Sequence, residues 1–478
     1  MAVDDGRFMR DPDALAWNME QDPGLRSTIV AVVWLDSSPD VGVVTARLER
    51  ATRIAPRFRQ RPLPAPVNLS TPQWVDCEFD LSLHFRRIGA PEPRTPATVV
   101  EFARREAMTG FDPSRPLWSF TLIEGLEGDR AAFVMKVHHS LTDGIGGMQL
   151  AMLVFETTPE PGPIEDHPAP ATGPVPSGLT RTTTAVGHSL GRVVGGLRAG
   201  IDEVGPVART VARHPVRSAL DVVATASSLG RFVTPVTDTL SPIMRGRSLD
   251  RHLALFEVDQ DDLRRAGATV GGTLNDAFMA AVSGGLRRYH ERHGAPVPEL
   301  RVMMPISLRR AEDPEGGNRI TLERFTVPVG EPDPGARVRM TGWRCRAARY
   351  EEVLPFSDHV AALLNLLPAG VLGSMLKHVD FLASNVPGVP FPIYLGGARV
   401  TGNYAFGPTT GAALNVTMVT HEGTCCMGCT IDTAAVTDPD VLVACLQAGF
   451  DEVLGLGGDH QPVTSLLTVR PAGSGAPA

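Results

Sequence analysis

Two adjacent histidines followed by Asp-Gly, in the segment KVHHSLTDGIGGM at residues 136–148, are the residues best suited to chemistry. A neutral imidazole has a pKa near 6.5 and can take up a proton at neutral pH. The preceding AAFVMKV predicts a strand, on which successive side chains point to opposite faces. His138 and His139 therefore cannot share a metal ion at this position. We expect one of them to face a cleft as a general base and the other to face the interior.

Two further residues of this segment are expected to orient the base. Asp143 can hold the loop through a buried pair with an arginine. Gly144 allows a backbone shape or a close approach that a side chain would block. A single histidine at a strand end is often an ordinary structural residue. The pair alone therefore leaves a structural and a catalytic interpretation open.

A second motif, GHSLG at residues 187–191, fits the G-x-S-x-G pattern of a lipase nucleophile and would make Ser189 the nucleophile. That turn needs a buried strand immediately before it and a helix after it. The preceding residues, GLTRTTTAV, are short and polar, and no HGGG-type oxyanion segment comes before them. We expect His188 and Ser189 to lie on the surface of an amphipathic helix.

Six cysteines occur in the chain, and three of them form the run CCMGC. Two of these match C-x-x-C, but the context GTCCMGCTID predicts a strand, and residues three apart on a strand face opposite sides. We expect reduced, packed thiols rather than a metal or redox site. The six are Cys77, Cys345, Cys425, Cys426, Cys429 and Cys445.

The composition is typical of a soluble globular protein, with 43% apolar and 21% charged residues in a chain of 478. The formal net charge of −8 argues against nucleic acid as a partner. The N-terminal sequence lacks the apolar core of a secretory signal, and no run reaches the roughly 20 apolar residues of a membrane-spanning helix. We therefore expect a cytoplasmic protein.

The chain is too long for one ordinary core, and its patterns divide it into two α/β parts. We expect an N-terminal domain at residues 1–158 and a C-terminal domain at residues 249–470. Between them, residues 159–248 predict an extended, mobile proline-rich linker and a basic helical crossover, and the tail 471–478 is expected to be disordered. Residues 181–247 contain nine arginines and four acidic residues, a net charge of +5. This segment is either a surface that docks on anionic lipid or phosphate, or a solvated crossover.

Apolar and alternating runs predict the strands, and a helical period predicts the helices. Strands are expected at 28–35, 131–137, 253–258, 301–307, 325–330 and 381–386, and a hairpin at 413–432. Helices are expected at 45–61 (ending in a turn), 144–156, 272–293 and 438–455.

Eight segments, taken together and in order, resemble the bacterial wax ester synthase/acyl-CoA:diacylglycerol acyltransferase family. HHSLTDG has the HHxxxDG form of the wider CoA-dependent acyltransferase superfamily. The resemblance covers nearly the whole chain, and its specificity comes from the ordered set rather than from any one motif. The segments are PRFRQR (56–61), FDLSLHFRRI (79–88), FDPSRPLW (111–118), KVHHSLTDGIGGM (136–148), LNDAFMAAVSGGLR (274–287), MPISLR (304–309), GNRI (317–320) and SNVPGVP (384–390).

The resemblance implies two chloramphenicol-acetyltransferase-like α/β domains, each a mixed β-sheet flanked by helices, with a channel between them. It implies an O-acyltransferase whose general base, His139, lies in that channel. His139 would take the hydroxyl proton of the acceptor as that oxygen attacks the thioester of acyl-CoA, and would then return the proton to the CoA thiolate. The implied acceptor is diacylglycerol, giving triacylglycerol, with a fatty alcohol as a second acceptor, giving wax ester. No metal or bound cofactor is implied.

The family motifs also imply roles for neighbouring residues. Asp143 matches the motif aspartate, and Arg309 is a candidate partner for it. Asn275 and Asp276 match an Asn-Asp pair that either supports the histidine or the oxyanion, or caps a helix. The Gly144 N–H is another candidate oxyanion donor. The motif residues Pro116, Leu117 and Trp118 are expected to pack and to shape the channel. Ser384, Asn385 and Pro387 match a turn near the domain interface.

An enzyme of this kind is expected to work at a membrane or lipid-droplet surface as a peripheral protein. Two other functions stay open. One is a serine esterase or lipase that uses Ser189. The other is a lipid-binding or droplet-coat protein without turnover, against which the intact His139, Asp143 and Asn275 argue.

Overall fold

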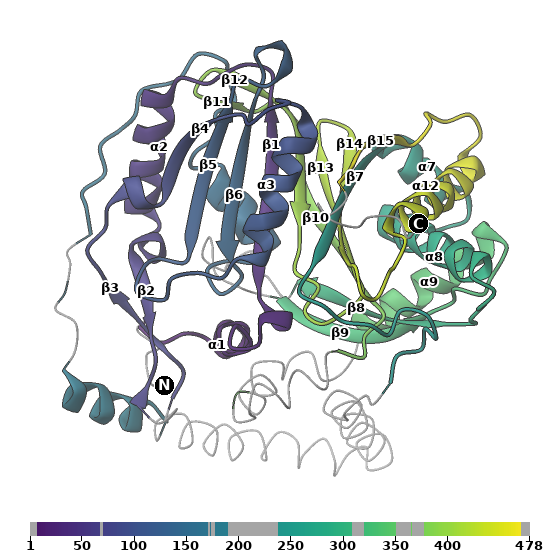
Figure 1. Ribbon diagram of the computed structural model, residues 1–478, viewed down its shortest axis with the longest axis horizontal. Helices are drawn as coiled ribbons and strands as arrows, with labels where there is room; N and C mark the ends of the chain where they lie inside the picture. The colour runs from purple at the N-terminus through teal and green to yellow at the C-terminus, as the bar shows by residue number, and fades with distance from the viewer. Residues whose placement is uncertain are drawn as a thin grey trace, which may run out of the picture.

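The computed structural model describes residues 7–66, 70–170, 173, 177–189, 238–307, 320–349, 365 and 377–469. Within these residues two large mixed β-sheets lie side by side, and helices pack against each of them (Figure 1). The predicted α/β architecture is therefore confirmed.

The N-terminal half supplies four strands of a six-stranded sheet with the order β11-β12-β1-β6-β5-β4. One face of this sheet, with Phe120 and Phe133, packs against α2. The opposite face, with Val32 and Val134, packs against α3. A separate two-stranded sheet joins β2 and β3. The elements of this half are α1 (Asp11–Met19), β1 (Thr28–Leu35), α2 (Val41–Ile54), β2 (Gln60–Leu63), β3 (Gln73–Asp76), β4 (Phe85–Gly89), α3 (Pro96–Met108), β5 (Trp118–Glu124), β6 (Ala131–His138) and α4 (Gly144–Ala151).

The C-terminal half contains a seven-stranded sheet with the order β15-β7-β14-β13-β10-β8-β9. Its core packs against α8 and α12, through residues such as Phe256, Phe278 and Phe450. The elements of this half are β7 (Arg251–Asp259), α7 (Gln260–Thr269), α8 (Leu274–Arg292), β8 (Leu300–Ser307), β9 (Ile320–Val327), α9 (Pro334–Arg349), β10 (Phe381–Val389), β11 (Tyr394–Leu395), β12 (Ala398–Phe406), β13 (Leu414–His421), β14 (Thr424–Asp432), α12 (Pro439–Leu454) and β15 (Thr464–Val469).

A strand exchange joins the two halves. β12 pairs antiparallel with β1, from Val30↔Phe406 to Leu35↔Val400, and so completes the N-terminal sheet. The expectation that residues 249–470 form a separate domain is therefore wrong for β11 and β12. Sequence periodicity shows that a strand forms but not which sheet it joins, because any half-buried strand has the same alternation.

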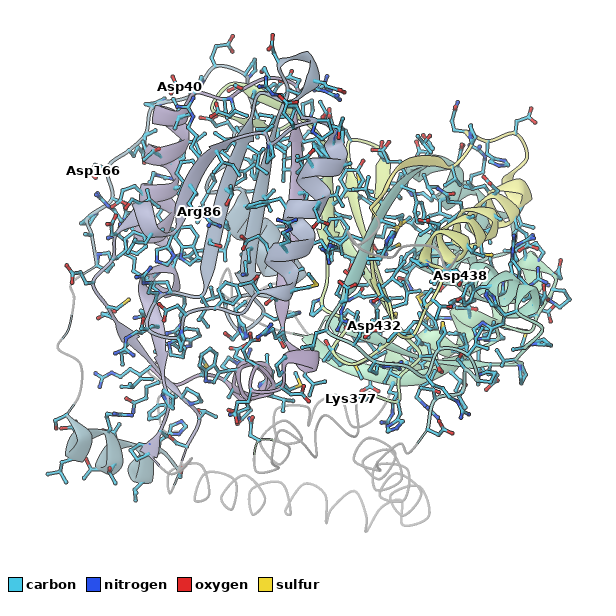
Figure 2. All side chains as sticks on the ribbon, viewed as in Figure 1. Asp40, Arg86, Asp166, Lys377, Asp432 and Asp438 are labelled. Atoms are coloured by element: carbon cyan, nitrogen blue, oxygen red, sulfur yellow. The ribbon has the colours of Figure 1, made fainter. Side chains whose placement is uncertain are left out.

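Ion pairs add to this connection between the halves. Arg104 on α3 bonds Asp250 at 2.7 Å, just before β7. Lys377, labelled in Figure 2, pairs with Asp22 at 2.9 Å. A shared apolar cluster also contains Val30 and Val32 of the first sheet and Leu255 of the second. These contacts hold the two halves in a fixed position relative to each other.

The proline-rich linker is described at residues 159–170 and 173, and its first part runs beside α2. Arg47 donates to the Gly162 carbonyl at 2.9 Å, and Arg53 pairs with Asp166 at 2.8 Å, the latter labelled in Figure 2. This part is extended, as expected, but it is attached to the N-terminal half rather than loose. Most of the basic segment 181–247 and the tail 471–478 lie outside the described residues.

The expected strands and helices are confirmed where they are described, with shifts at their ends. The predicted strand at 28–35 matches β1, and the predicted hairpin forms β13 and β14. The helix predicted at 144–156 ends earlier, at Ala151, and the chain then turns toward a bridge between Glu156 and Tyr394.

Candidate active site

A cavity of about 730 Å³ lies between the two halves, and both contribute to its wall. The N-terminal half supplies α1, α2, α4 and the inner face of β6. The C-terminal half supplies the start of α8, the end of α9, and strands β8, β10, β12 and β13. Most of the lining is apolar, so the cavity suits a hydrocarbon with few polar groups.

His139 lines this cavity immediately after β6 ends at His138. Its backbone N–H donates to the Ser27 carbonyl at 2.8 Å, which extends the β1–β6 pairing by one step and fixes the backbone. The strand alternation then directs the ring to the same face as Met135 and Val137, which also line the cavity. The expectation that one histidine faces a cleft is confirmed.

Burial lowers the pKa of His139 below its usual 6.5, because the imidazolium form loses solvation inside the protein. A hydrogen bond from the ring to its own backbone, and the charge of Asp143, oppose this shift. The ring is therefore neutral at neutral pH. A ring N–H that bonds the backbone leaves the other ring nitrogen as a proton acceptor.

His138 points to the opposite face and does not line the cavity. Its ring is fully buried, with Nδ1 2.8 Å from the Ser140 hydroxyl and Nε2 3.4 Å from the Glu20 carboxylate. Trp17 and Phe111 meet it edge-on. The sequence expected one of the two histidines to face the interior, and His138 is that residue; its surroundings fit a residue that positions the loop rather than one that meets a substrate.

Asp143 is buried and caps the N-terminus of α4. Its side chain accepts from Gly146 N–H at 2.7 Å, and its carbonyl accepts from Gly147 N–H at 2.7 Å. The aspartate therefore fixes the turn between the histidines and the helix. Its expected partner Arg309 lies outside the described residues, so that pair is untested.

Gly144 follows as the first residue of α4, and here the two halves meet. A Cβ at this position would lie 2.8 Å from Val386 Cγ2 on β10. Gly144 does not carry a positive φ, so the requirement is for space rather than for an unusual backbone conformation. The sequence expected a glycine here either for an unusual backbone shape or for a close approach, and the structure supports the close approach.

Asn275 and Asp276, at the start of α8, have different surroundings. Asp276 forms a capping box with Thr273, at 2.9 and 3.2 Å, and pairs with Arg346 at 3.2 Å. Asn275 lines the cavity, and its side-chain oxygen accepts from Asn385 at 3.4 Å. Of the two expected roles, capping belongs to Asp276, and Asn275 is placed where it can act on a substrate.

The remaining family matches lie on or behind the cavity wall. Trp118 lines the cavity and donates from its indole nitrogen to the Phe58 carbonyl at 2.9 Å. Pro116 and Leu117 are buried, and the Leu117 carbonyl accepts from the His138 N–H at 3.0 Å. Ser384, Asn385 and Pro387 line the cavity. The expected turn at these residues is wrong, because they lie inside strand β10, where Ser384 and Asn385 pair with β13.

Sequence reasoning missed several residues of the site. The Ser27 carbonyl accepts a hydrogen bond from the backbone N–H of His139. The Glu20 carboxylate in turn accepts one from the Ser27 N–H at 3.2 Å. Asn403 lines the cavity from the exchanged strand β12, and Arg346 and Arg349 line it from α9. No motif marks these residues, because their place depends on how distant strands and helices pair.

The two competing motifs are not supported as sites. Ser189 lies in a helix over residues 178–189, and no strand comes directly before it, which contradicts a lipase-type nucleophile turn. Cys426 packs toward the first sheet, whereas Cys429 packs into the second core, so they face opposite sides as predicted. Burial raises the pKa of both thiols to about 12. Within the described ranges, no group of three or more His, Cys, Asp or Glu residues is arranged to hold a metal ion.

Two family models match the chain. Residues 9–278 match the wax ester synthase/diacylglycerol acyltransferase catalytic domain, and residues 316–453 match the C-terminal domain of the same family. A Mycobacterium tuberculosis H37Rv protein, provisionally named a diacylglycerol O-acyltransferase, is 34% identical over 455 residues, covering 94% of this chain and 92% of its own. Another H37Rv protein with the same provisional description is 30% identical over 424 residues, covering 85% of this chain and 87% of its own.

Solved structures share the fold. The wax ester synthase/diacylglycerol acyltransferase from Marinobacter aquaeolei VT8 aligns with a TM-score of 0.63 at 21% identity, covering 95% of this chain and all of that one. The starter condensation domain of rhizomide synthetase, solved with C8-CoA and Leu-SNAC, aligns with a TM-score of 0.58 at 14% identity, covering 95% of each chain.

Proposed function

The chain belongs to the wax ester synthase/diacylglycerol acyltransferase family, and from this premise we propose that it transfers a long-chain acyl group from acyl-CoA to the hydroxyl of a lipid. One observation carries the proposal: His139 lines a largely apolar cavity shared by both halves, where burial lowers its pKa and favours the neutral ring. Two substrates can meet at that ring while bulk water is kept away.

His139 acts as the general base. The ring nitrogen takes the acceptor's hydroxyl proton as that oxygen forms a bond to the thioester carbon. The tetrahedral intermediate then collapses, the carbon–sulfur bond breaks, and the imidazolium gives its proton to the departing thiolate. The products are an ester and free CoA, and proton transfer of this kind contributes about 10² to 10⁴ in rate.

The negative oxygen of the intermediate needs hydrogen-bond donors, and two groups that border the cavity are candidates. Gly144 begins α4, where the first N–H groups of a helix lack partners within the helix. Asn275 faces the same cavity from the other half. We propose that Asn275 and the Gly144 N–H share this task. His138, Asp143 and Asp276 then hold the histidine loop and the start of α8 in position.

We propose that the reaction needs no metal or bound cofactor. The thioester is already an activated acyl group, and His139 moves the one proton that the reaction transfers. Acyl-CoA is consumed as a substrate.

Diacylglycerol is the acceptor that we favour, with a fatty alcohol as a second acceptor. Support comes from the two relatives described above, whose provisional names specify diacylglycerol. The apolar wall that includes Leu48, Phe58 and Met135 suits the hydrocarbon chains of either molecule.

The test is to supply labelled acyl-CoA with diacylglycerol or a long-chain alcohol, and to follow triacylglycerol, wax ester and free CoA. Ester formation with stoichiometric release of CoA is expected, with diacylglycerol the better acceptor. Release of free fatty acid from an ester, dependent on Ser189, would point to a hydrolase. Lipid binding without any turnover would point to a carrier.

We further propose that the protein works in the cytoplasm as a peripheral protein of a membrane or lipid inclusion, where its acceptor is dissolved. The helix at residues 178–189 supports this, because it exposes Leu179 (78%) and Val186 (40%), seven residues apart on one face. In the described residues, no helix has the length and apolarity needed to cross a bilayer. Co-sedimentation with anionic vesicles tests the proposal: Leu179→Asp/Val186→Asp should weaken binding, and unchanged binding would contradict it.

A further inference from the structure

The two sides of the cavity wall differ in chemistry. Toward the N-terminal half it is bordered by apolar side chains of α1 and α2, including Leu15, Met19 and Leu48. Toward the C-terminal half it is bordered by the start of α8 and the last turn of α9, where Arg346 and Arg349 line it. Among the described residues of the wall, these two are the only arginines or lysines.

Both arginines line the cavity and are also exposed, so the cavity reaches the surface beside the last turn of α9. We propose that Arg346 and Arg349 bind the phosphate groups of the CoA part of the acyl donor, which therefore enters by this opening. The inference rests on the proposed acyl transfer, and it assigns one side of the cavity to one substrate.

A continuous series of contacts connects this opening to the histidine loop. Gly144 packs on Val386, and the neighbouring Asn385 bonds Asn275 at 3.4 Å. The next residue along α8, Asp276, pairs with Arg346 at 3.2 Å. A donor whose phosphates lie at the arginines can therefore extend its pantetheine arm along β10 and the start of α8 to the thioester position at His139.

The state of Arg346 suits an anion. Its contact among the described residues is the single ion pair with Asp276, and its side chain stays 53% exposed. A guanidinium has five N–H donors in a planar fork that matches phosphate oxygens. The Asp276 pair holds one edge of the group in place, while the exposed part can face a phosphate. Arg349 lies three residues further along α9, on an adjoining part of the helix surface.

On the side of α1 and α2, none of the described residues that line the cavity is charged. Leu15 and Met19 from α1, and Leu48 and Phe58 from α2 and the turn after it, suit hydrocarbon. This side therefore accommodates the lipid chains, while the side with the two arginines takes the water-soluble part of the donor.

The experiment compares acyl-CoA with acyl-pantetheine, which carries the same thioester without the phosphates. In Arg346→Gln/Arg349→Gln we expect the KM for acyl-CoA to rise about tenfold, since charge-assisted hydrogen bonds to phosphate are lost. The kcat, the KM for diacylglycerol and the kinetics with acyl-pantetheine should not change. Salt should raise the wild-type KM for acyl-CoA more than that of the variant.

Matched variants separate binding from structure. Arg339→Gln removes an exposed arginine of α9 that does not line the cavity, so it should leave the KM for acyl-CoA unchanged. Arg349→Gln alone leaves the Asp276 pair intact, and Arg346→Lys retains the charge; each should show a smaller rise than the double variant.

Three results would overturn the inference: an unchanged KM for acyl-CoA, an equal rise with acyl-pantetheine, or a rise in the KM for diacylglycerol instead. Wild-type protein that turns over neither donor would refute the proposed function. Calorimetric titration with CoA then still tests the arginine site, because it measures binding without turnover. The inference requires the double variant to bind CoA more weakly than wild type does.

Discussion

Gly144, the glycine of the histidine loop, lies directly against Val386 of β10, so that a methyl group on Gly144 would come within 2.8 Å of Val386 Cγ2. This contact brings the loop that carries His139 against the strand that carries Ser384 and Asn385. The position of the base relative to the C-terminal half therefore depends on the absence of one side chain.

Gly144→Ala should force these two elements apart and lower kcat by about 10²-fold, because small misplacements of a catalytic group are costly. The double variant Gly144→Ala/Val386→Ala removes the clashing methyl groups and should recover much of the activity. Steady-state kinetics on the four proteins of this cycle provide the measurement. A Gly144→Ala protein as active as wild type would contradict the close-approach role.

His139→Ala should lower ester formation by about 10² to 10⁴ while the protein remains folded, because the general base is lost and little packing is removed. Circular dichroism and thermal unfolding serve as the control for folding. Ser189→Ala should retain full activity. Full activity in His139→Ala would overturn the mechanism.

His138→Ala should act mainly on stability. The ring is fully buried beside Trp17 and Phe111 and bonds Ser140, so removing it leaves a cavity and an unpaired hydroxyl. A loss of about 2–4 kcal/mol in the free energy of unfolding is expected. Urea denaturation measures this value. A variant as stable as wild type but without turnover would instead show a direct catalytic part for His138.

The pH dependence follows from the lowered pKa of His139. Burial disfavours the imidazolium, so the ring stays neutral to lower pH than an exposed histidine. The acid limb of the kcat/KM profile should therefore have its midpoint below 6.5, with activity lost as pH falls through it. The charge of Asp143 opposes the shift, so Asp143→Asn should move the limb to still lower pH. A limb above 6.5 would be inconsistent with a desolvated base.

Asn275→Ala and Asp276→Ala form a matched pair at the start of α8. Asn275→Ala should reduce kcat by about 10²-fold with little change in stability, as for the loss of one oxyanion donor. Asp276→Ala should lower stability by about 1–2 kcal/mol through loss of the capping box. Steady-state kinetics and thermal unfolding of both variants provide the measurement. A loss of stability in Asn275→Ala together with a loss of kcat alone in Asp276→Ala would contradict these two roles.

The sequence alone determined the local features of the protein. The pattern of AAFVMKV followed by HHSLTDG predicted a strand that ends at the histidines, and strand alternation predicted that the two rings point apart. Both expectations are confirmed by β6 and by the opposite surroundings of His138 and His139. The same alternation correctly predicted that Cys426 and Cys429 face opposite sides.

Only the tertiary structure decided which distant residues meet. The sequence could not show that β12 leaves the C-terminal half to pair with β1, that Val386 requires a glycine at position 144, or that Arg346 and Arg349 border the cavity. The physical reason is that local periodicity depends on neighbours along the chain. Strand partners, close approaches and a shared cavity depend instead on contacts between residues hundreds of positions apart.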